Sequence, residues 1–234
     1  MATFLQVTTR LLQYINRPST EADVLAAVKA SINDACLYLQ RDHAFAYTEC
    51  LSTFIYPANG LSVDVGIVCD GNLRDVISIQ QISTGGTYEG KTIKIKSYAQ
   101  LQTDRRNYAR SHSIDPNQVY TESIAGLTVE DGYREDMIAW VMGNEIGLYP
   151  RPNAATTFLL HYHVWLPEMA DDTDTNFFLE YCLDAVVTIA LKRLHIFMKL
   201  DSRYQVTNEE LAVLVQGIHA WDSQVKENPN TSIG

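Results

Sequence analysis

The pattern of apolar positions divides the chain into helical ends and a middle of short strands. A first helix is predicted over residues 3–16, ahead of Pro18. A second helix is predicted to start with Thr20 as its N-cap and to end near Asp42. Its apolar positions recur at helical spacing and are expected to face a core: Leu25, Val28, Ile32, Ala35, Cys36 and Leu39.

The C-terminal part repeats this helical pattern. Residues 176–199 predict a long helix, and the ionisable residues within it place it in a protein core and not in a membrane. Thr207 and Glu210 form a T-x-x-E capping box before a last helix. The apolar face of that helix is Leu211, Leu214, Val215, Ile218, Trp221 and Val225. The polar tail Glu227–Gly234 is expected to be flexible unless a partner orders it.

The middle of the chain consists of short runs rich in Ile, Val and Phe, separated by turn residues, which is typical of strands. Residues 91–96 alternate between apolar and basic positions. Gly143-Asn144 is a two-residue turn with glycine first, and predicts a type II′ hairpin over residues 137–149. The other predicted strands are 51–56, 61–69, 73–82, 91–96 and 156–166.

These elements predict an α+β fold. Each helical pair alone is too small to cover its own apolar stripe, so the two pairs are expected to form one bundle with the β region inserted between them. The predicted boundaries are 1–43 with 168–228 for the discontinuous bundle, 44–167 for an antiparallel β-rich domain, and 229–234 for the tail.

Charge narrows the range of partners. The 234-residue chain has a net charge of −10 and a pI near 5.0, which argues against tight binding of duplex nucleic acid. A basic segment, 91–112, contrasts with an acidic one, 168–184. One interpretation is that the two segments are solvated faces. The other is that the basic segment of one copy of the chain binds the acidic segment of another copy. The residues that would form such contacts are Arg105, Arg106, Arg110, Asp171, Asp172 and Asp174. The arginine cluster lies between Tyr98 and Tyr108, so it could alternatively contact a nucleic-acid backbone.

The four cysteines are widely spaced, with no C-x-x-C pair, so neither a zinc site nor a redox pair is indicated. This pattern fits a reducing cytoplasm, and the first residues do not have the pattern of a signal peptide. Cys36 and Cys182 fall on apolar helix faces and are interpreted as small core residues.

Residues 85–92 match the phosphate-binding pattern G-x-x-x-x-G-K-[ST], through Gly85, Gly90, Lys91 and Thr92. Such a loop needs a helix to follow it, because the aligned N–H groups at the start of a helix bind the phosphates. Here an alternating, strand-like run follows. We therefore interpret the motif as a glycine-rich connection between strands, with no nucleotide cofactor expected.

Two further patterns resemble metal sites. Asp172–Asn176 begins like a calcium loop, but Phe177 replaces the required glycine and Leu183 the final glutamate. This segment is interpreted as a helix N-terminus with acidic groups near the positive end of the dipole. His161 and His163 share one face of a strand without an evident third ligand, and are interpreted as polar strand residues. No metal is expected, and no catalytic constellation is evident.

The ordered set of patterns resembles a known family, the head-to-tail adaptor (connector) proteins of short-tailed bacteriophages. The likeness rests first on Leu12–Arg17 before a capped helix, and then on the hairpin Gly143–Pro152 with the strand Thr156–Trp165. It ends with the long apolar helix followed by a capped helix that carries Trp221. The resemblance covers most of the chain except roughly 97–132.

The resemblance implies a non-enzymatic virion protein, made in the host bacterial cytoplasm and placed in the neck of the particle. About twelve copies would form a ring that binds the portal protein above and a tail (nozzle) protein below, and DNA would pass through it without sequence-specific binding. The tail residues Asn228, Pro229, Asn230 and Ile233 are candidates for portal contact.

Two other functions remain open from the sequence. One is a nucleotide-binding protein that uses Gly85–Thr92, and the other is a binding module whose β domain recognises a carbohydrate or a host surface.

Overall fold

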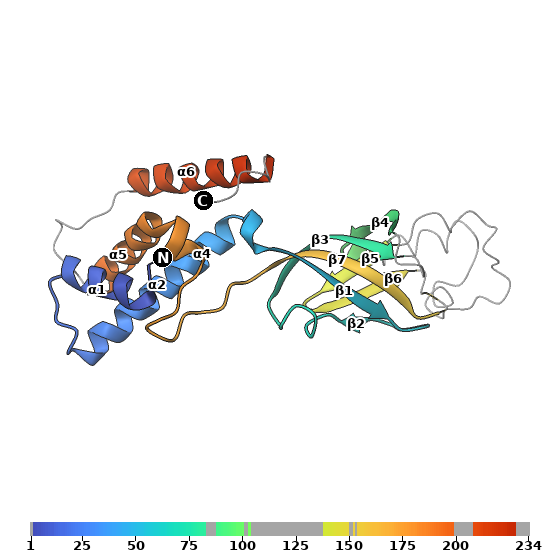
Figure 1. Cartoon of the computed structure of the whole chain (residues 1–234), viewed down its shortest axis with the longest axis horizontal. Coiled ribbons are helices and arrows are strands. Elements are labelled where there is room, and N and C mark those ends of the chain that lie inside the picture. Colours follow the sequence, from blue (N-terminus) through green and yellow to red (C-terminus); the bar gives the residue numbers. More distant parts are fainter. Residues whose placement is uncertain are drawn as a thin grey trace. The chain divides into compact units, whose positions relative to one another are not determined.

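The computed structural model describes residues 2–82, 88–100, 103, 138–149, 152, 154–198 and 208–227. The chain divides into two compact units, a helical unit of Met1–Thr48 with Leu166–Gly234, and a sheet unit of Glu49–Trp165 (Figure 1). The predicted mixture of helices and strands is confirmed. No helix of the described residues has both the length and the apolar character needed to cross a membrane.

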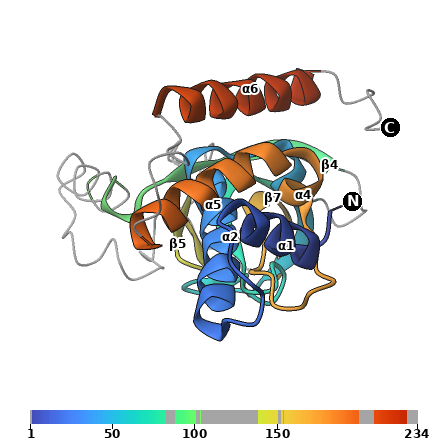
Figure 2. The ribbon, with the colours of Figure 1, turned by 90° about the vertical axis from the view of Figure 1, so that its left-hand side faces the viewer.

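The helical unit takes its elements from both ends of the chain: α1 (Phe4–Tyr14), α2 (Ala22–Asp42), the short 3₁₀ helix η1 (Ala46–Thr48), α4 (Phe177–Tyr181), α5 (Leu183–Met198) and α6 (Asn208–Glu227). Helix α2 lies beside α5, and α1 packs against both (Figures 1 and 2). Residues far apart in the sequence therefore share one core.

Two of the predicted helix boundaries are wrong. Helix α2 starts after Glu21, whose side chain makes no capping hydrogen bond, so Thr20 is not the N-cap. The long helix predicted over residues 176–199 is broken at Cys182, which separates α4 from α5. Asn176 caps α4, because its side chain accepts a hydrogen bond from the backbone N–H of Leu179 at 3.1 Å. Thr207 lies outside the described residues.

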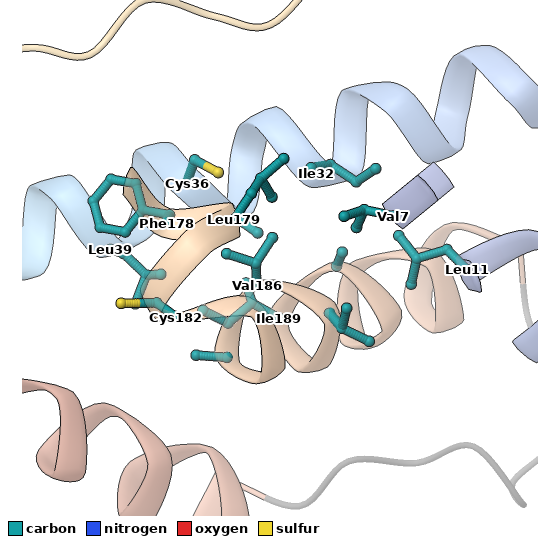
Figure 3. Packing of buried hydrophobic residues seen from close by; sticks show 14 of the residues in the cluster. Val7, Leu11, Ile32, Cys36, Leu39, Phe178, Leu179, Cys182, Val186 and Ile189 are labelled. Carbon is teal, nitrogen blue, oxygen red and sulfur yellow. The ribbon is translucent and has the colours of Figure 1, made fainter. Parts of the chain in front are cut away.

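The core of the helical unit lies between α2 and the α4–α5 pair. Ile32 and Leu39 of α2 share one buried cluster with Val186 and Ile189 of α5, and Figure 3 shows Leu39 near Phe178 and Ile32 near Val7. The break at Cys182 lets the short α4 bury three consecutive residues, Phe177–Leu179, at one end of this core. The apolar stripe predicted for α2 is confirmed, with Val28, Ile32, Ala35, Cys36 and Leu39 buried and Leu25 partly buried.

Cys36 and Cys182 are buried in this core, as predicted, and burial raises the pKa of each thiol to about 12. At pH 8 only about one such thiol in 10⁴ is ionised, and the thiolate is the reactive form.

We expect both thiols to resist an aromatic disulfide reagent in the native protein and to react within seconds in denaturant. Spectroscopic thiol counting with and without denaturant checks this, and immediate reaction of all four cysteines in the native state would contradict it.

The sheet unit contains seven described strands: β1 (Glu49–Tyr56), β2 (Val63–Asp64), β3 (Leu73–Ile82), β4 (Tyr88–Lys96), β5 (Ile138–Met142), β6 (Glu145–Tyr149) and β7 (Thr156–Val164). Their order in the sheet is β1-β7-β3-β4-β5-β6-β2. All pairs are antiparallel except β4–β5, which is parallel, so the expected antiparallel sheet is corrected to a mixed one. A parallel pair needs a crossover of a dozen or more residues, and the long connection between β4 and β5 meets that need.

The hairpin of β5 and β6 is confirmed, with Met142 opposite Glu145. Gly143 has a φ of +61°, the left-handed region that the first position of a II′ turn requires. The strand predicted over residues 61–69 is reduced to Val63–Asp64. The N–H of Val65, just after the strand, donates to the carbonyl of Asn144 at 2.9 Å, and residues 66–71 form turns.

The core of the sheet unit lies on one face of the strands. Phe54 stacks on Phe158 with their ring centroids 5.6 Å apart. Tyr56 is fully buried, and its hydroxyl donates to the carbonyl of Gly60 at 3.1 Å and accepts the N–H of Leu148 at 3.2 Å. These contacts join β1, the following turn and β6 within the unit.

Candidate interaction surface

Strand β1 is apolar on both of its faces. Phe54 and Tyr56 point into the core, while Leu51, Thr53 and Ile55 point away from it. Leu51 and Ile55 are each 65% exposed. Single exposed aliphatic side chains are ordinary, but Leu51, Thr53 and Ile55 occupy successive outward positions of one strand, so the two aliphatic side chains and the threonine between them form one row.

The neighbouring strands extend this row. In the antiparallel pair β1–β7, Leu159 lies opposite Thr53, and Thr157 lies opposite Ile55. In β3 the register shift between Val76 and Ser78 leaves Ile77 40% exposed. We call Leu51, Thr53, Ile55, Thr157, Leu159 and Ile77 the outer face.

Strand β1 is also an edge of the sheet, since β7 is its sole neighbour among the described strands. The inner side of β1 is paired with β7 over eight residues, Glu49 to Tyr56. Edge strands of monomeric proteins are usually protected by lysine, proline or a bulge. The outward positions 51, 53 and 55 carry no charge, so this edge has the composition of a surface that another chain covers.

At one end of the outer face lie the two histidines of β7. His161 Nε2 is 3.2 Å from Glu49 Oε2, and His163 is buried opposite Glu49 and Asp75. Within the described part of the chain, no three His, Cys, Asp or Glu side chains are grouped so as to hold a metal ion. The polar groups here border the outer face.

The glycine-rich motif falls on a strand. Gly90, Lys91 and Thr92 belong to β4, and Thr92 is paired with Gln80 of β3. The prediction that a strand follows the motif is confirmed, so no helix N-terminus stands where the phosphates would bind. Gly85 lies outside the described residues.

The acidic segment before α4 accepts hydrogen bonds from the first backbone N–H groups of α1. The backbone N–H of Phe4 donates to the carbonyl of Asp174 at 2.8 Å, and that of Leu5 donates to the carbonyl of Asp172 at 3.0 Å. The Asp172 carboxylate also pairs with Lys29 Nζ at 2.6 Å. The segment therefore lies at the positive end of the α1 dipole. It also ends in Asn176, the N-cap of α4, so the prediction that it forms a helix N-terminus is confirmed.

Asp174 is held by backbone donors. Its carboxylate accepts the N–H groups of Asp171 and Ala170, each at 2.8 Å, and these bonds lower its pKa. Because the pKa of Asp174 is lower in the folded state than in the unfolded state, ionised Asp174 stabilises the folded protein at pH values above its unfolded-state pKa. This stabilisation is lost as the pH falls through the folded-state pKa.

Three of the six predicted contact residues are thus placed, all in this acidic segment. Asp172 and Asp174 have the intramolecular roles described above, and Asp171 supplies a backbone N–H to Asp174. The other three, Arg105, Arg106 and Arg110, lie outside the described residues. So do the portal-contact candidates Asn228, Pro229, Asn230 and Ile233.

The sequence interpretation missed the outer face. The available signal was the run Leu51–Tyr56, in which large apolar residues occupy both odd and even positions. A strand that is apolar on both faces is typical of a sheet covered on both sides.

The chain matches no protein-family model and no curated protein. Its own surfaces are therefore the basis for a functional proposal.

Proposed function

We propose that this chain is a non-enzymatic subunit of a phage head-to-tail adaptor ring, located in the neck of the virion between the portal and the tail protein. In this proposal the helical unit is a bundle and the sheet unit is its insertion. The observation that carries it is the outer face, an uncharged patch of Leu, Ile and Thr side chains on the edge strand β1 and its neighbours β7 and β3, within which Leu51 and Ile55 are each 65% exposed. Such a patch suits contact with a neighbouring protein.

The apolar area of the outer face is small, and this affects whether two subunits could bind each other without the portal. Complete burial of an aliphatic side chain contributes about 1.5–3 kcal/mol, so covering Leu51 and Ile55 from 65% exposure contributes about 1–2 kcal/mol each. Association of two proteins costs an estimated 4–15 kcal/mol in lost freedom. The outer face alone is too small for stable pairing, so we expect the subunits to assemble on the portal, which supplies further contacts.

Charge supports the same role. At −10 per copy, a ring of about twelve subunits carries a charge near −120, which would repel DNA from the wall of a channel. DNA could then slide through without being retained.

The alternatives are less well supported by the described residues. A nucleotide site would require a helix where β4 runs. A carbohydrate-binding surface is typically aromatic, whereas the outer face is formed by Leu, Ile and Thr side chains.

The experiment is to mix the protein with the portal protein of the same phage and to image the particles by electron microscopy. We expect rings with the wild-type chain and at least about tenfold fewer with the Leu51→Asp/Ile55→Asp double variant, because burying two carboxylates without partners is costly. Ile196→Asp is the matched control, since Ile196 is 73% exposed on α5 of the helical unit.

Thermal unfolding of the three proteins should agree within a few degrees, so that lost assembly is separated from lost folding. The proposal fails if the wild-type chain forms no ring on its portal. The assignment of the outer face fails if the double variant assembles as well as the control.

A further inference from the structure

Helix α6 buries a carboxylate where most helices bury an aliphatic side chain. Of the residues in this 20-residue helix, Val215 and Asp222 are the buried ones. The Asp222 side chain is 1% exposed. An ionised carboxylate removed from water is unfavourable unless it is paired and hydrogen-bonded.

Two partners of Asp222 come from the segment that follows α2, and a third, Lys226, comes from α6 itself. One carboxylate oxygen accepts the backbone N–H of Ala46 at 2.9 Å. The other lies 2.8 Å from His43 Nε2 and 3.4 Å from Lys226 Nζ. Lys226 also donates to the carbonyl of Ala44 at 2.7 Å, so the last turns of α6 are tied to residues 43–46 at several points.

A second contact lies one helical turn earlier. The ring of His219 stacks on that of His43 with their centroids 4.4 Å apart, and His219 Nε2 is 3.1 Å from the Asp42 carboxylate without the geometry of a hydrogen bond. The ring of Phe45 meets His43 edge-on at 4.8 Å. We call Asp42, His43, His219, Asp222 and Lys226 the latch.

The apolar core contrasts with this polar attachment. Val215 is the one buried core residue of the helical unit that α6 supplies, while Leu211, Ile218 and Trp221 are partly buried against the core. All other buried members of that core come from elsewhere in the unit, chiefly from α1, α2, α4 and α5. Removing α6 would therefore leave the packing between α2 and α5 in place.

We propose that α6 is a separately opening element of the helical unit and that the latch, centred on Asp222, holds it closed. A buried polar contact of this kind adds little net stability when intact, but it fixes one docking position and is costly to break on one side. Regions with few buried apolar contacts open below the free energy of global unfolding. The latch thus sets how often α6 leaves the rest of the unit.

Hydrogen–deuterium exchange of the full chain, resolved by peptide, tests this. In the wild-type protein we expect the α6 amides to exchange faster than those of the central turns of α2 and α5. Asp222→Asn should speed exchange in α6 by about 100-fold, because a neutral amide loses the charge-assisted hydrogen bonds that the carboxylate makes with Ala46 N–H, His43 and Lys226. Exchange in α2 and α5 should change by less than about threefold.

Asp184→Asn is the matched control, because the Asp184 side chain is 80% exposed on α5, and it should leave exchange in α6 unchanged. His43→Gln removes the other side of the latch and should speed α6 exchange in the same selective way. The proposal is overturned if α2, α5 and α6 accelerate together in either latch variant, if neither variant accelerates α6, or if Asp222→Asn unfolds the whole unit.

Discussion

Replacing Phe178 by alanine is expected to lower the free energy of unfolding of the helical unit by about 3–5 kcal/mol. Phe178 is fully buried in α4, and its ring meets that of Phe45 at 5.1 Å in a T-shaped contact. The ring joins the turn after α2 to the C-terminal helices, so its loss leaves a cavity between segments from both ends of the chain.

The measurement is chemical denaturation followed by far-ultraviolet circular dichroism for the helices and by hydrogen exchange of the strand peptides for the sheet. Because the chain divides into two compact units, we expect the transition of the helical unit to move while that of the sheet unit stays in place. Ile196→Ala is the control, since an exposed side chain on α5 should contribute less than about 0.5 kcal/mol. A single transition that shifts for both units would contradict independent folding.

The helices and the hairpin were predictable because their signals are local. The stripe of α2 repeats every three to four residues, and Gly143 supplies the φ that a II′ turn needs. The break at Cys182 was not predictable, because α4 and α5 read as one continuous apolar helix. What separates them is the packing of Phe177–Leu179 against residues more than a hundred positions earlier.

The pairing of strands was not predictable either. The parallel neighbours β4 and β5 are joined by a long connection, and nothing in the run Lys91–Lys96 specifies its partner. The burial of Asp222 was not predictable either, because an acidic residue in a polar stretch of helix is normally exposed to solvent. Its burial depends on His43, which lies 179 positions earlier in the chain.

The outer face differs from these, because the sequence contained its signal. Alternation of burial along β1 assigns Phe54 and Tyr56 to the core, and the apolar residues left at odd positions must then face outward. The acidic segment was also visible as a run of charged residues. Its hydrogen bonds to the start of α1 were not predictable, because they use backbone carbonyls, which every residue has.

Replacing Gly147 by alanine is expected to destabilise the sheet unit by about 1–3 kcal/mol. Gly147 of β6 lies directly opposite Trp140 of β5, and a Cβ at this position would fall on the indole ring. Moving the ring would disturb its T-shaped contact with Tyr98, whose ring centroid lies 5.3 Å away. The glycine is thus required by the cross-strand neighbour and not by the backbone, whose φ is not positive here.

A double-mutant cycle separates these two causes. In a Trp140→Ala background the indole is gone, so Gly147→Ala should cost less than about 0.5 kcal/mol, and the coupling between the two positions should account for most of the effect. Thermal unfolding of the four proteins measures it. Gly143→Ala is the contrasting control, because its φ of +61° makes the cost intrinsic to the backbone and independent of Trp140. Equal destabilisation by Gly147→Ala in both backgrounds would mean that the strand, and not the aromatic ring, demands glycine.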